Sequence, residues 1–276
     1  MKELTLKDMQ QVLFDILKDI HAFCIKNDIQ YSLAYGTLLG AVRHKGFIPW
    51  DDDIDLYMTR PNYERFIKAY KSENGYVMVP PSDSYIAFAR VCDTKRTFMK
   101  STLPWFPSSR SKELGLWVDI FPIDGLDDIG TMKKKMPEIT AIRRLQLTAR
   151  RAMPNPSFDL SLKHSIRQIL RKIKYCRLDV KKVNKQLIDR CTETPYETAP
   201  YCSQFACNTV GESEWYEKRY FEDLIELEFE GEKFLAPKDW DSVLNIIFGS
   251  DYMTPPPEDK REQHSLDHNR FFWKDA

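Results

Sequence analysis

The sequence lacks any long apolar run. A charged residue interrupts every apolar stretch within about ten positions, whereas a helix that crosses a bilayer needs roughly 20 apolar residues. The first residues pass directly into an amphipathic pattern and show no secretory signal. These absences predict a cytoplasmic chain that is at most peripheral at the inner membrane surface.

Paired cysteines and an excess of one charge are also missing. The six cysteines form no Cys-x-x-Cys pair, so we expect free thiols rather than disulfides or a structural zinc site. Lys and Arg balance Asp and Glu at 41 each, which gives no reason to expect a nucleic-acid partner. The apolar fraction of 42% is sufficient for a sizeable hydrophobic core.

Charge is nevertheless distributed unevenly along the chain. Residues 133–190 hold 17 basic residues against four acidic ones, and the rest of the chain carries the opposite excess of 13. The periodicity predicts two basic helices, over 131–151 and 160–191, separated by the breaker Pro154-Asn155-Pro156. Such a segment either meets an anionic partner or forms a solvated helical surface, and the sequence leaves both open.

Periodicity elsewhere predicts an α+β fold with a mixed sheet flanked by helices. We expect a catalytic core over 1–125, an inserted basic helical module over 126–192 and a C-terminal segment over 193–276 that packs back on the core. Segment 95–112 reads as an irregular loop. Helices are predicted over 5–27, 37–45, 61–70 and 240–248, and strands over 31–35, 54–58, 76–79, 85–92, 117–123 and 224–229.

Four aspartates lie within five residues, in the run Asp51-Asp52-Asp53-Ile54-Asp55. Strand alternation would turn Asp53 and Asp55 to one face and bury Ile54 on the other. Two adjacent carboxylates in a dry cleft repel each other unless a cation lies between them. The hard cations Mg²⁺ and Mn²⁺ suit such oxygen ligands and are commonly shared with substrate phosphates. We therefore predict that Asp53 and Asp55 bind a divalent metal, with Asp51 and Asp52 as supporting residues.

Upstream of this run, Gly36 and Thr37 close a predicted strand and open a helix. Backbone N–H groups at a helix N-terminus can bind phosphate, and the Thr37 hydroxyl could add another donor. A glycine turn, a short helix and then Asp-x-Asp on a neighbouring strand is typical of nucleotidyltransferase active sites. Gly36 and Thr37 are thus candidate substrate-binding residues.

Three segments together resemble the LicD family, whose members include bacterial phosphocholine transferases and whose relatives include fukutin-related glycan phosphotransferases. They run from Gly36-Thr37-Leu38-Leu39-Gly40-Ala41 through Trp50-Asp51-Asp52-Asp53-Ile54-Asp55, over 118–124 and over 248–256. The resemblance implies a nucleotidyltransferase-like fold with catalytic, metal-binding aspartates at Asp53 and Asp55. It also implies a third carboxylate on an adjacent strand. Asp119 is the better match, and Asp124, expected in a loop just past Pro122, is the competitor.

Three further residues are candidates for substrate contact, each with a structural alternative. Arg43 could hold phosphate oxygens or complement a helix C-terminus. Arg90 falls among inward-facing residues of a predicted strand, where its partner would be either a phosphate or a structural aspartate. His264 resembles a histidine typical of the family, although lone histidines are more often structural.

The resemblance implies transfer of phosphocholine from CDP-choline to a sugar hydroxyl of a lipid-linked teichoic-acid-like or other surface glycan precursor, releasing CMP. A quaternary ammonium relies on aromatic faces, and Trp50 and the pair Trp105-Phe106 are the best candidates. Three alternatives stay open: transfer of another group such as phosphoethanolamine or a sugar phosphate, an Asp-x-Asp glycosyltransferase, and a non-enzymatic module that binds glycan or membrane.

Overall fold

The computed structural model describes residues 2–81, 86–101, 114–152, 166, 169–170, 173–174, 178–208, 210–261 and 269–274. Its helices are α1 (Leu6–Lys26), α2 (Tyr35–His44), α3 (Arg60–Ala69), α5 (Ile129–Ala152), α7 (Val180–Cys191), α8 (Arg219–Glu222) and α9 (Trp240–Phe248), with the 3₁₀ turns η1 (Gly211–Ser213) and η2 (Glu258–Lys260). Its strands are β1 (Ser32–Leu33), β2 (Asp55–Thr59), β3 (Val77–Val79), β4 (Ala89–Asp93), β5 (Thr97–Ser101), β6 (Leu116–Leu126), β7 (Tyr201–Ser203), β8 (Tyr216–Glu217), β9 (Leu224–Phe229), β10 (Glu232–Pro237) and β11 (Asn269–Trp273).

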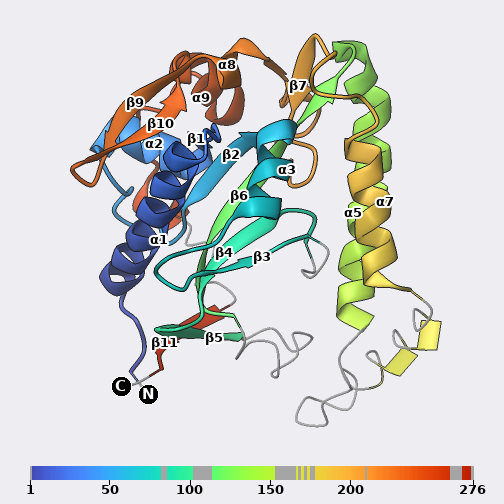
Figure 1. Cartoon of the computed structure of the whole chain (residues 1–276). Helices are drawn as coiled ribbons and strands as arrows, with labels where there is room; N and C mark the ends of the chain where they lie inside the picture. The colour runs from blue at the N-terminus through green and yellow to red at the C-terminus, as the bar shows by residue number, and fades with distance from the viewer. Residues whose placement is uncertain are drawn as a thin grey trace.

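The central sheet is mixed, which confirms the predicted α+β class. Its strands follow the order β1-β2-β6-β4-β3, and β7 and β8 extend it from the far end of β6. Strands β2 and β6 run parallel, whereas β1, β4 and β3 join by antiparallel pairing. Helices α1 and α3 lie across this sheet (Figure 1).

Helix α1 forms as its sequence predicts. Thr5 and Asp8 make a reciprocal capping box, in which the Asp8 amide donates to the Thr5 hydroxyl and the Thr5 amide to the Asp8 carboxylate. Its apolar residues then recur at helical spacing and are fully buried, among them Met9, Leu13, Ile16, Leu17 and Ile20. Burying each such side chain contributes about 1.5–3 kcal/mol. This helix therefore anchors the layer that covers the sheet.

Strand β6 continues through Pro122, so the expectation that Asp124 lies in a loop is wrong. The Asp119 amide donates to Ile54 of the segment entering β2. By alternation, the nitrogen of Pro122 faces the other side of β6. On that side, pairing with β4 ends at Ile120 and pairing with β7 begins at Asp124. The proline thus falls in a gap of the ladder, where its missing N–H costs no hydrogen bond.

The C-terminal segment packs against the N-terminal half. Strand β7 pairs with β6, β11 pairs with β5, and the β9–β10 hairpin contacts β1 and α2. A single buried hydrophobic cluster includes side chains from Leu4 to Phe271. The expectation of an irregular segment from residue 95 is corrected by β5, which is stabilised by a partner strand distant in sequence.

Helices α5 and α7 lie side by side and extend away from the sheet (Figure 1). They share a second, smaller core that contains Met132, Met136, Ile139 and Leu187. The second basic helix, predicted over 160–191, is described as α7 from Val180 and as separate helical residues between 166 and 174. None of the described helices combines the length and apolar character needed to cross a bilayer.

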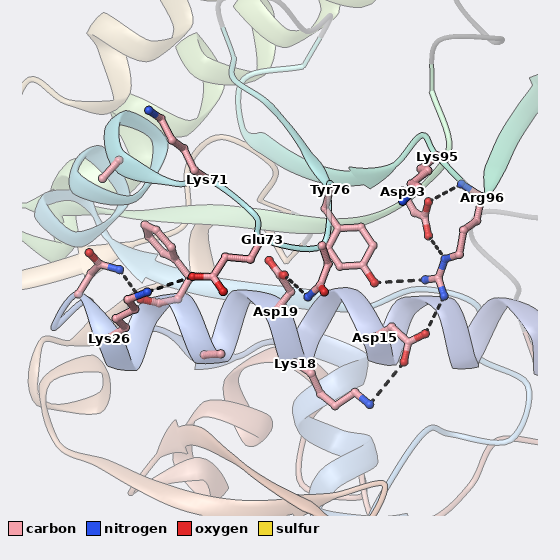
Figure 2. Close-up of a pocket in the computed structure, with 15 residues that line it drawn as sticks. Asp15, Lys18, Asp19, Lys26, Lys71, Glu73, Tyr76, Asp93, Lys95 and Arg96 are labelled. Atoms are coloured by element: carbon pink, nitrogen blue, oxygen red, sulfur yellow. Dashed lines mark hydrogen bonds and ion pairs between the residues drawn. The ribbon is translucent and has the colours of Figure 1, made fainter.

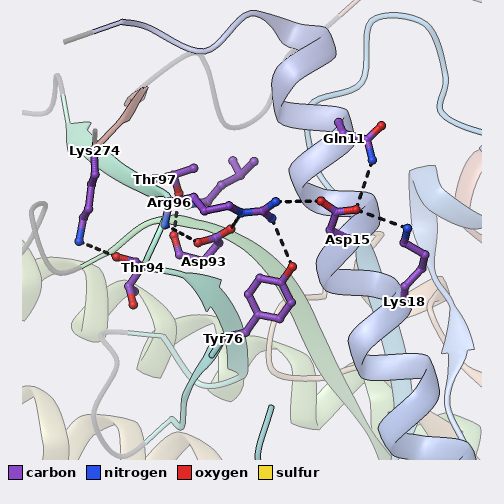
Figure 3. A network of polar contacts seen from close by, with 10 residues as sticks. Gln11, Asp15, Lys18, Tyr76, Asp93, Thr94, Arg96, Thr97 and Lys274 are labelled. Atoms are coloured by element: carbon purple, nitrogen blue, oxygen red, sulfur yellow. Dashed lines mark hydrogen bonds and ion pairs between the residues drawn. The ribbon is translucent and has the colours of Figure 1, made fainter. Parts of the chain in front are cut away.

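A hollow of about 850 Å³ lies between α1, the segment 69–76 that leads into β3, and the β4–β5 turn (Figure 2). Its charged side chains largely partner one another. Arg96 donates to Asp93 at 2.5 Å, to Asp15 at 2.9 Å and to the Tyr76 hydroxyl at 3.2 Å (Figure 3). Asp19 accepts three hydrogen bonds from the 70–74 segment. This network fastens the β4–β5 turn to α1, and so fixes the strand that carries Arg90.

The ion pair between Arg60 and Asp124 yields a first test. Arg60 donates from Nε and Nη2 to the two oxygens of Asp124, at 2.6 and 3.0 Å, and the Asp124 side chain is only 1% exposed. Arg60→Met leaves this buried carboxylate unpaired and is expected to lower the free energy of unfolding in urea by about 3–5 kcal/mol. Arg65→Met, on the exposed side of the same helix, should change it by less than about 1 kcal/mol. Equal effects would contradict a structural role for the pair.

Candidate active site

A pocket of about 1040 Å³ opens between the central sheet, α2, α9 and the 251–260 segment. Seven of the predicted site residues line it, namely Gly36, Arg43, Trp50, Asp53, Asp55, Arg90 and Asp119. Thr37 lies behind its wall, and Asp51 and Asp251 add two further carboxylates. His264, Trp105 and Phe106 fall outside the described residues. Residues far apart in the sequence thus meet at one face.

Three charged side chains form a row across neighbouring strands. In the sheet register Asp55 of β2 lies beside Asp119 of β6, which lies beside Arg90 of β4. Arg90 Nε donates to Asp119 Oδ1 at 2.6 Å, and its guanidinium stacks 4.1 Å from the Trp117 ring centroid. The Trp117 indole donates to the other oxygen of Asp119 at 3.2 Å. Arg90 is therefore paired with an aspartate while it also lines the pocket.

The carboxylates at the head of β2 are crowded. Ligand oxygens of Asp51, Asp52 and Asp53 lie within 4.8 Å of one another. Although the pocket leaves part of Asp55 accessible, desolvation raises its pKa well above the usual range, and the charges of Asp53 and Asp119 raise it further. Desolvation also raises the pKa of Asp51, with Asp53 as the next cause. Hard oxygen ligands that repel one another in a pocket suit a divalent cation such as Mg²⁺ or Mn²⁺.

Strand β2 begins only at Asp55, so Asp53 reaches the pocket from the preceding loop and not by strand alternation. That loop is tightly held, because the Asp51 amide donates to Ile48 and the Asp51 carbonyl accepts from Gln10 Nε2. The three carboxylates whose oxygens lie closest together therefore include Asp51, for which the sequence predicted only a supporting role. Asp52 is fully buried and does not line the pocket.

Gly36 is required by the close approach of this loop. A Cβ atom at Gly36 would lie 2.8 Å from Asp51 Oδ2, closer than van der Waals contact permits. The glycine is the second residue of α2, so the helix N-terminus and the carboxylate loop meet at this point. A side chain here would displace Asp51 from its position.

Thr37 positions Asp55. Its side chain is 3% exposed, and its hydroxyl accepts a hydrogen bond of 2.9 Å from the Asp55 amide. This contact uses the hydroxyl oxygen as an acceptor, and Thr37 does not line the pocket, so its predicted donation to a phosphate stays a prediction. The contact fixes the start of β2 against α2, which sets the depth at which Asp55 enters the pocket.

A buried glutamate that no sequence motif indicates supports the same helix. Tyr35, the first residue of α2, has φ of +40° and donates from its hydroxyl to Glu214 Oε1 at 2.7 Å. The Tyr216 hydroxyl lies 3.3 Å from the same oxygen, and Glu214 is fully buried. A backbone in this unfavourable region persists only where its surroundings hold it. Glu214 follows Tyr35 by 179 positions, in a segment without recognisable periodicity.

Cationic and aromatic groups also contribute to the pocket and to its surroundings. Arg43 Nη1 donates to the Tyr252 carbonyl at 2.8 Å, burial lowers the pKa of its guanidinium, and within the described ranges it forms no ion pair. The guanidinium of Arg261 stacks 4.3 Å from the ring centroid of Trp50. Trp50 thus already presents one face to a cation.

Comparison with known proteins gives a family match and a relative that is similar over nearly the whole chain. A family model described as LicD/FKTN/FKRP, nucleotidyltransferase domain, matches residues 28–141. The chain is 31% identical to the lipopolysaccharide cholinephosphotransferase LicD of Haemophilus influenzae over 274 residues, which cover 96% of this chain and 98% of that protein. Uncharacterized proteins of Rickettsia prowazekii and Rickettsia typhi are each 54% identical over 44 residues, 16% of this chain and 16% and 14% of theirs.

The hydrogen bond between Thr37 and Asp55 can be tested by its removal. Thr37→Val keeps the shape of the side chain but leaves the Asp55 amide without its acceptor, so we expect the free energy of unfolding to fall by about 1–3 kcal/mol. Thr37→Ser retains the hydroxyl and should lose less. Urea denaturation of the three proteins measures the difference. If valine and serine behaved alike, the hydroxyl would not be what holds Asp55.

Proposed function

The chain belongs to the LicD/FKTN/FKRP family, and we propose that it transfers phosphocholine from CDP-choline to a sugar hydroxyl of a lipid-linked, teichoic-acid-like or other surface glycan precursor. The full-length similarity to a lipopolysaccharide cholinephosphotransferase supports phosphocholine as the group and a glycan as the acceptor. The pocket supports it independently, because crowded carboxylates, an arginine without an ion pair among the described residues and a tryptophan face suit a metal, a phosphate and a quaternary ammonium respectively.

The proposed metal ligands are Asp53, Asp55 and Asp119, with Asp51 close enough to join them. A bound Mg²⁺ or Mn²⁺ supplies charge neutralisation for the pyrophosphate of the donor. Both oxygens of Asp119 accept hydrogen bonds from the protein, from Arg90 and Trp117. This carboxylate is therefore held in one orientation before substrate binds, as preorganised catalysis requires.

Arg43 is the proposed contact for donor phosphate. Arg43 lines the pocket, its guanidinium donates to the Tyr252 carbonyl and to His44 Nδ1, and it forms no ion pair in the described part of the chain. A planar guanidinium can hold two phosphate oxygens at once. Gly36 lies in the first turn of α2 and lines the pocket, so its backbone amide is a second proposed contact for donor phosphate.

The reaction that these groups suit is a single displacement at phosphorus. The sugar hydroxyl oxygen attacks the phosphorus that bears choline, a new P–O bond forms, and the bond to the CMP oxygen breaks. The hydroxyl proton passes to a carboxylate of the pocket, for which Asp119 is the proposed residue, and CMP leaves with the bonding electrons. The choline ammonium would lie against Trp50, in contact with its ring face.

The metal role predicts a result besides activity. Asp55→Asn removes one of several mutually repelling charges, so the metal-free variant is expected to unfold at a higher urea concentration than the wild type. It should lose the stabilisation that Mg²⁺ gives the wild type, about 2.7 kcal/mol at 100 times Kd. We expect transfer from CDP-choline, followed as CMP release, to fall by about 10³-fold or more.

The matched control is Asp28→Asn. Asp28 is exposed and has φ of +51°, a conformation that asparagine adopts readily. This variant should keep both turnover and the Mg²⁺-dependent gain in stability. An Asp55→Asn enzyme that turns over at the wild-type rate would exclude the proposed metal site.

The choline role of Trp50 predicts a change in donor preference. Trp50→Leu removes the ring face, so KM for CDP-choline should rise by about 2–30-fold, with a smaller change for CDP-ethanolamine, whose ammonium can still donate hydrogen bonds. Trp240→Leu, at a half-buried tryptophan outside the pocket, should leave the ratio unchanged. A wild-type preference for CDP-ethanolamine, measured by mass spectrometry of the product, would identify phosphoethanolamine as the transferred group.

A further inference from the structure

A short stretch between α5 and α7 exposes four large aliphatic side chains. Ile166, Ile169, Leu170 and Ile173 are between 37% and 67% exposed, and each has helical backbone. Their spacing of three, four and seven positions is the spacing of residues that share one side of a helix. We call these four residues the aliphatic row.

Elsewhere in the described ranges, large exposed apolar residues are scattered. They are Ile25, Val77, Leu147, Phe248 and Met253, which come from five different elements or loops. Isolated exposed apolar residues are normal on protein surfaces, whereas a contiguous group marks an interaction site. The aliphatic row places four of them within eight positions and therefore marks an interaction site.

The charge around the aliphatic row identifies the kind of partner. The sequence of this stretch carries Lys163, Arg167, Arg171, Lys172, Lys174 and Arg177, with no acidic residue from 160 to 178. Aliphatic residues at helical spacing within a strongly basic sequence are the pattern of a segment that binds at the interface of an anionic bilayer. There the aliphatic side chains enter the boundary between headgroups and acyl chains, and the basic side chains meet anionic headgroups.

The position of the segment suits this partner. Its described parts lie beyond the end of the α5–α7 pair, away from the central sheet (Figure 1). At its other end the α5–α7 pair packs against the end of β6, since Leu126 of β6 belongs to the small core that the two helices share. Contact with a surface at the tip would leave the pocket uncovered.

We propose that the aliphatic row inserts into an anionic phospholipid bilayer and holds the enzyme at the surface where a lipid-linked acceptor lies. The link to the acceptor rests on the proposed function, whereas binding to the bilayer does not. Insertion supplies an apolar contribution to affinity that the basic charge of this region alone would not give. The row is thus a membrane-docking element separate from the pocket.

Co-sedimentation of the full chain with vesicles tests the docking. Vesicles of phosphatidylcholine with about one-third phosphatidylglycerol should bind the protein, and phosphatidylcholine alone should not. The double variant Ile169→Ser, Ile173→Ser keeps every charge but removes half of the row, so binding should weaken about tenfold or more. The matched double variant Ile25→Ser, Val77→Ser removes two equally exposed aliphatic residues elsewhere and should bind as the wild type does.

Three results would overturn the inference: no binding of the wild type to anionic vesicles, equal loss in both double variants, or sedimentation velocity showing a dimer that only the row variant dissociates. The last would assign the row to a second copy of this chain. Transfer to a soluble sugar acceptor should be unchanged in the row variant and lost only for an acceptor embedded in vesicles. Vesicle binding without any phosphocholine transfer would refute the proposed function and leave the docking intact.

Discussion

Mutual repulsion among the carboxylates at the head of β2 is the constraint on which the rest of the structure depends. Asp51, Asp52 and Asp53 share a small volume, and the pKa values of Asp51 and Asp55 are raised by desolvation and by their acidic neighbours. An unrelieved cluster of this kind destabilises a fold. The carboxylates stay close together because the surrounding elements hold them in place. A divalent cation shared with a substrate phosphate would neutralise their charge.

Neighbouring elements fix the individual carboxylates of the pocket. Thr37 accepts the Asp55 amide, Gly36 leaves room for Asp51, and Arg90 orients Asp119 from the adjacent strand. Asp124, five residues beyond Asp119 on the same strand, is paired with Arg60 outside the pocket. The same strand therefore contributes one carboxylate to the site and one to stability. Their different partners distinguish these two roles.

The local parts of this site could be predicted from sequence, and the distant parts could not. Gly36, Asp53 and Asp55 belong to one short segment whose residue types and spacing predict a metal and phosphate site. Asp119 was predicted as the third carboxylate from the resemblance to the LicD family. Glu214 contacts Tyr35 and Arg261 contacts Trp50 only because the C-terminal segment packs against the core, and the sequence around them shows no periodicity that would predict these contacts. Strand β5 was missed for a related reason, because its pairing partner β11 lies at the far end of the chain. The position of Asp124 just past Pro122 predicted a loop. This prediction was wrong because the gap in the hydrogen-bond ladder that accommodates Pro122 is set by three other strands, β2, β4 and β7.

The most direct test of the central claim is the anomalous diffraction of Mn²⁺ in crystals of the full chain grown with CDP-choline. The account predicts an anomalous peak coordinated by Asp53 and Asp55, with the donor pyrophosphate as a further ligand and Arg43 on its other side. A nucleotide bound in this pocket with no metal on either aspartate, or a metal bound only elsewhere, would contradict it.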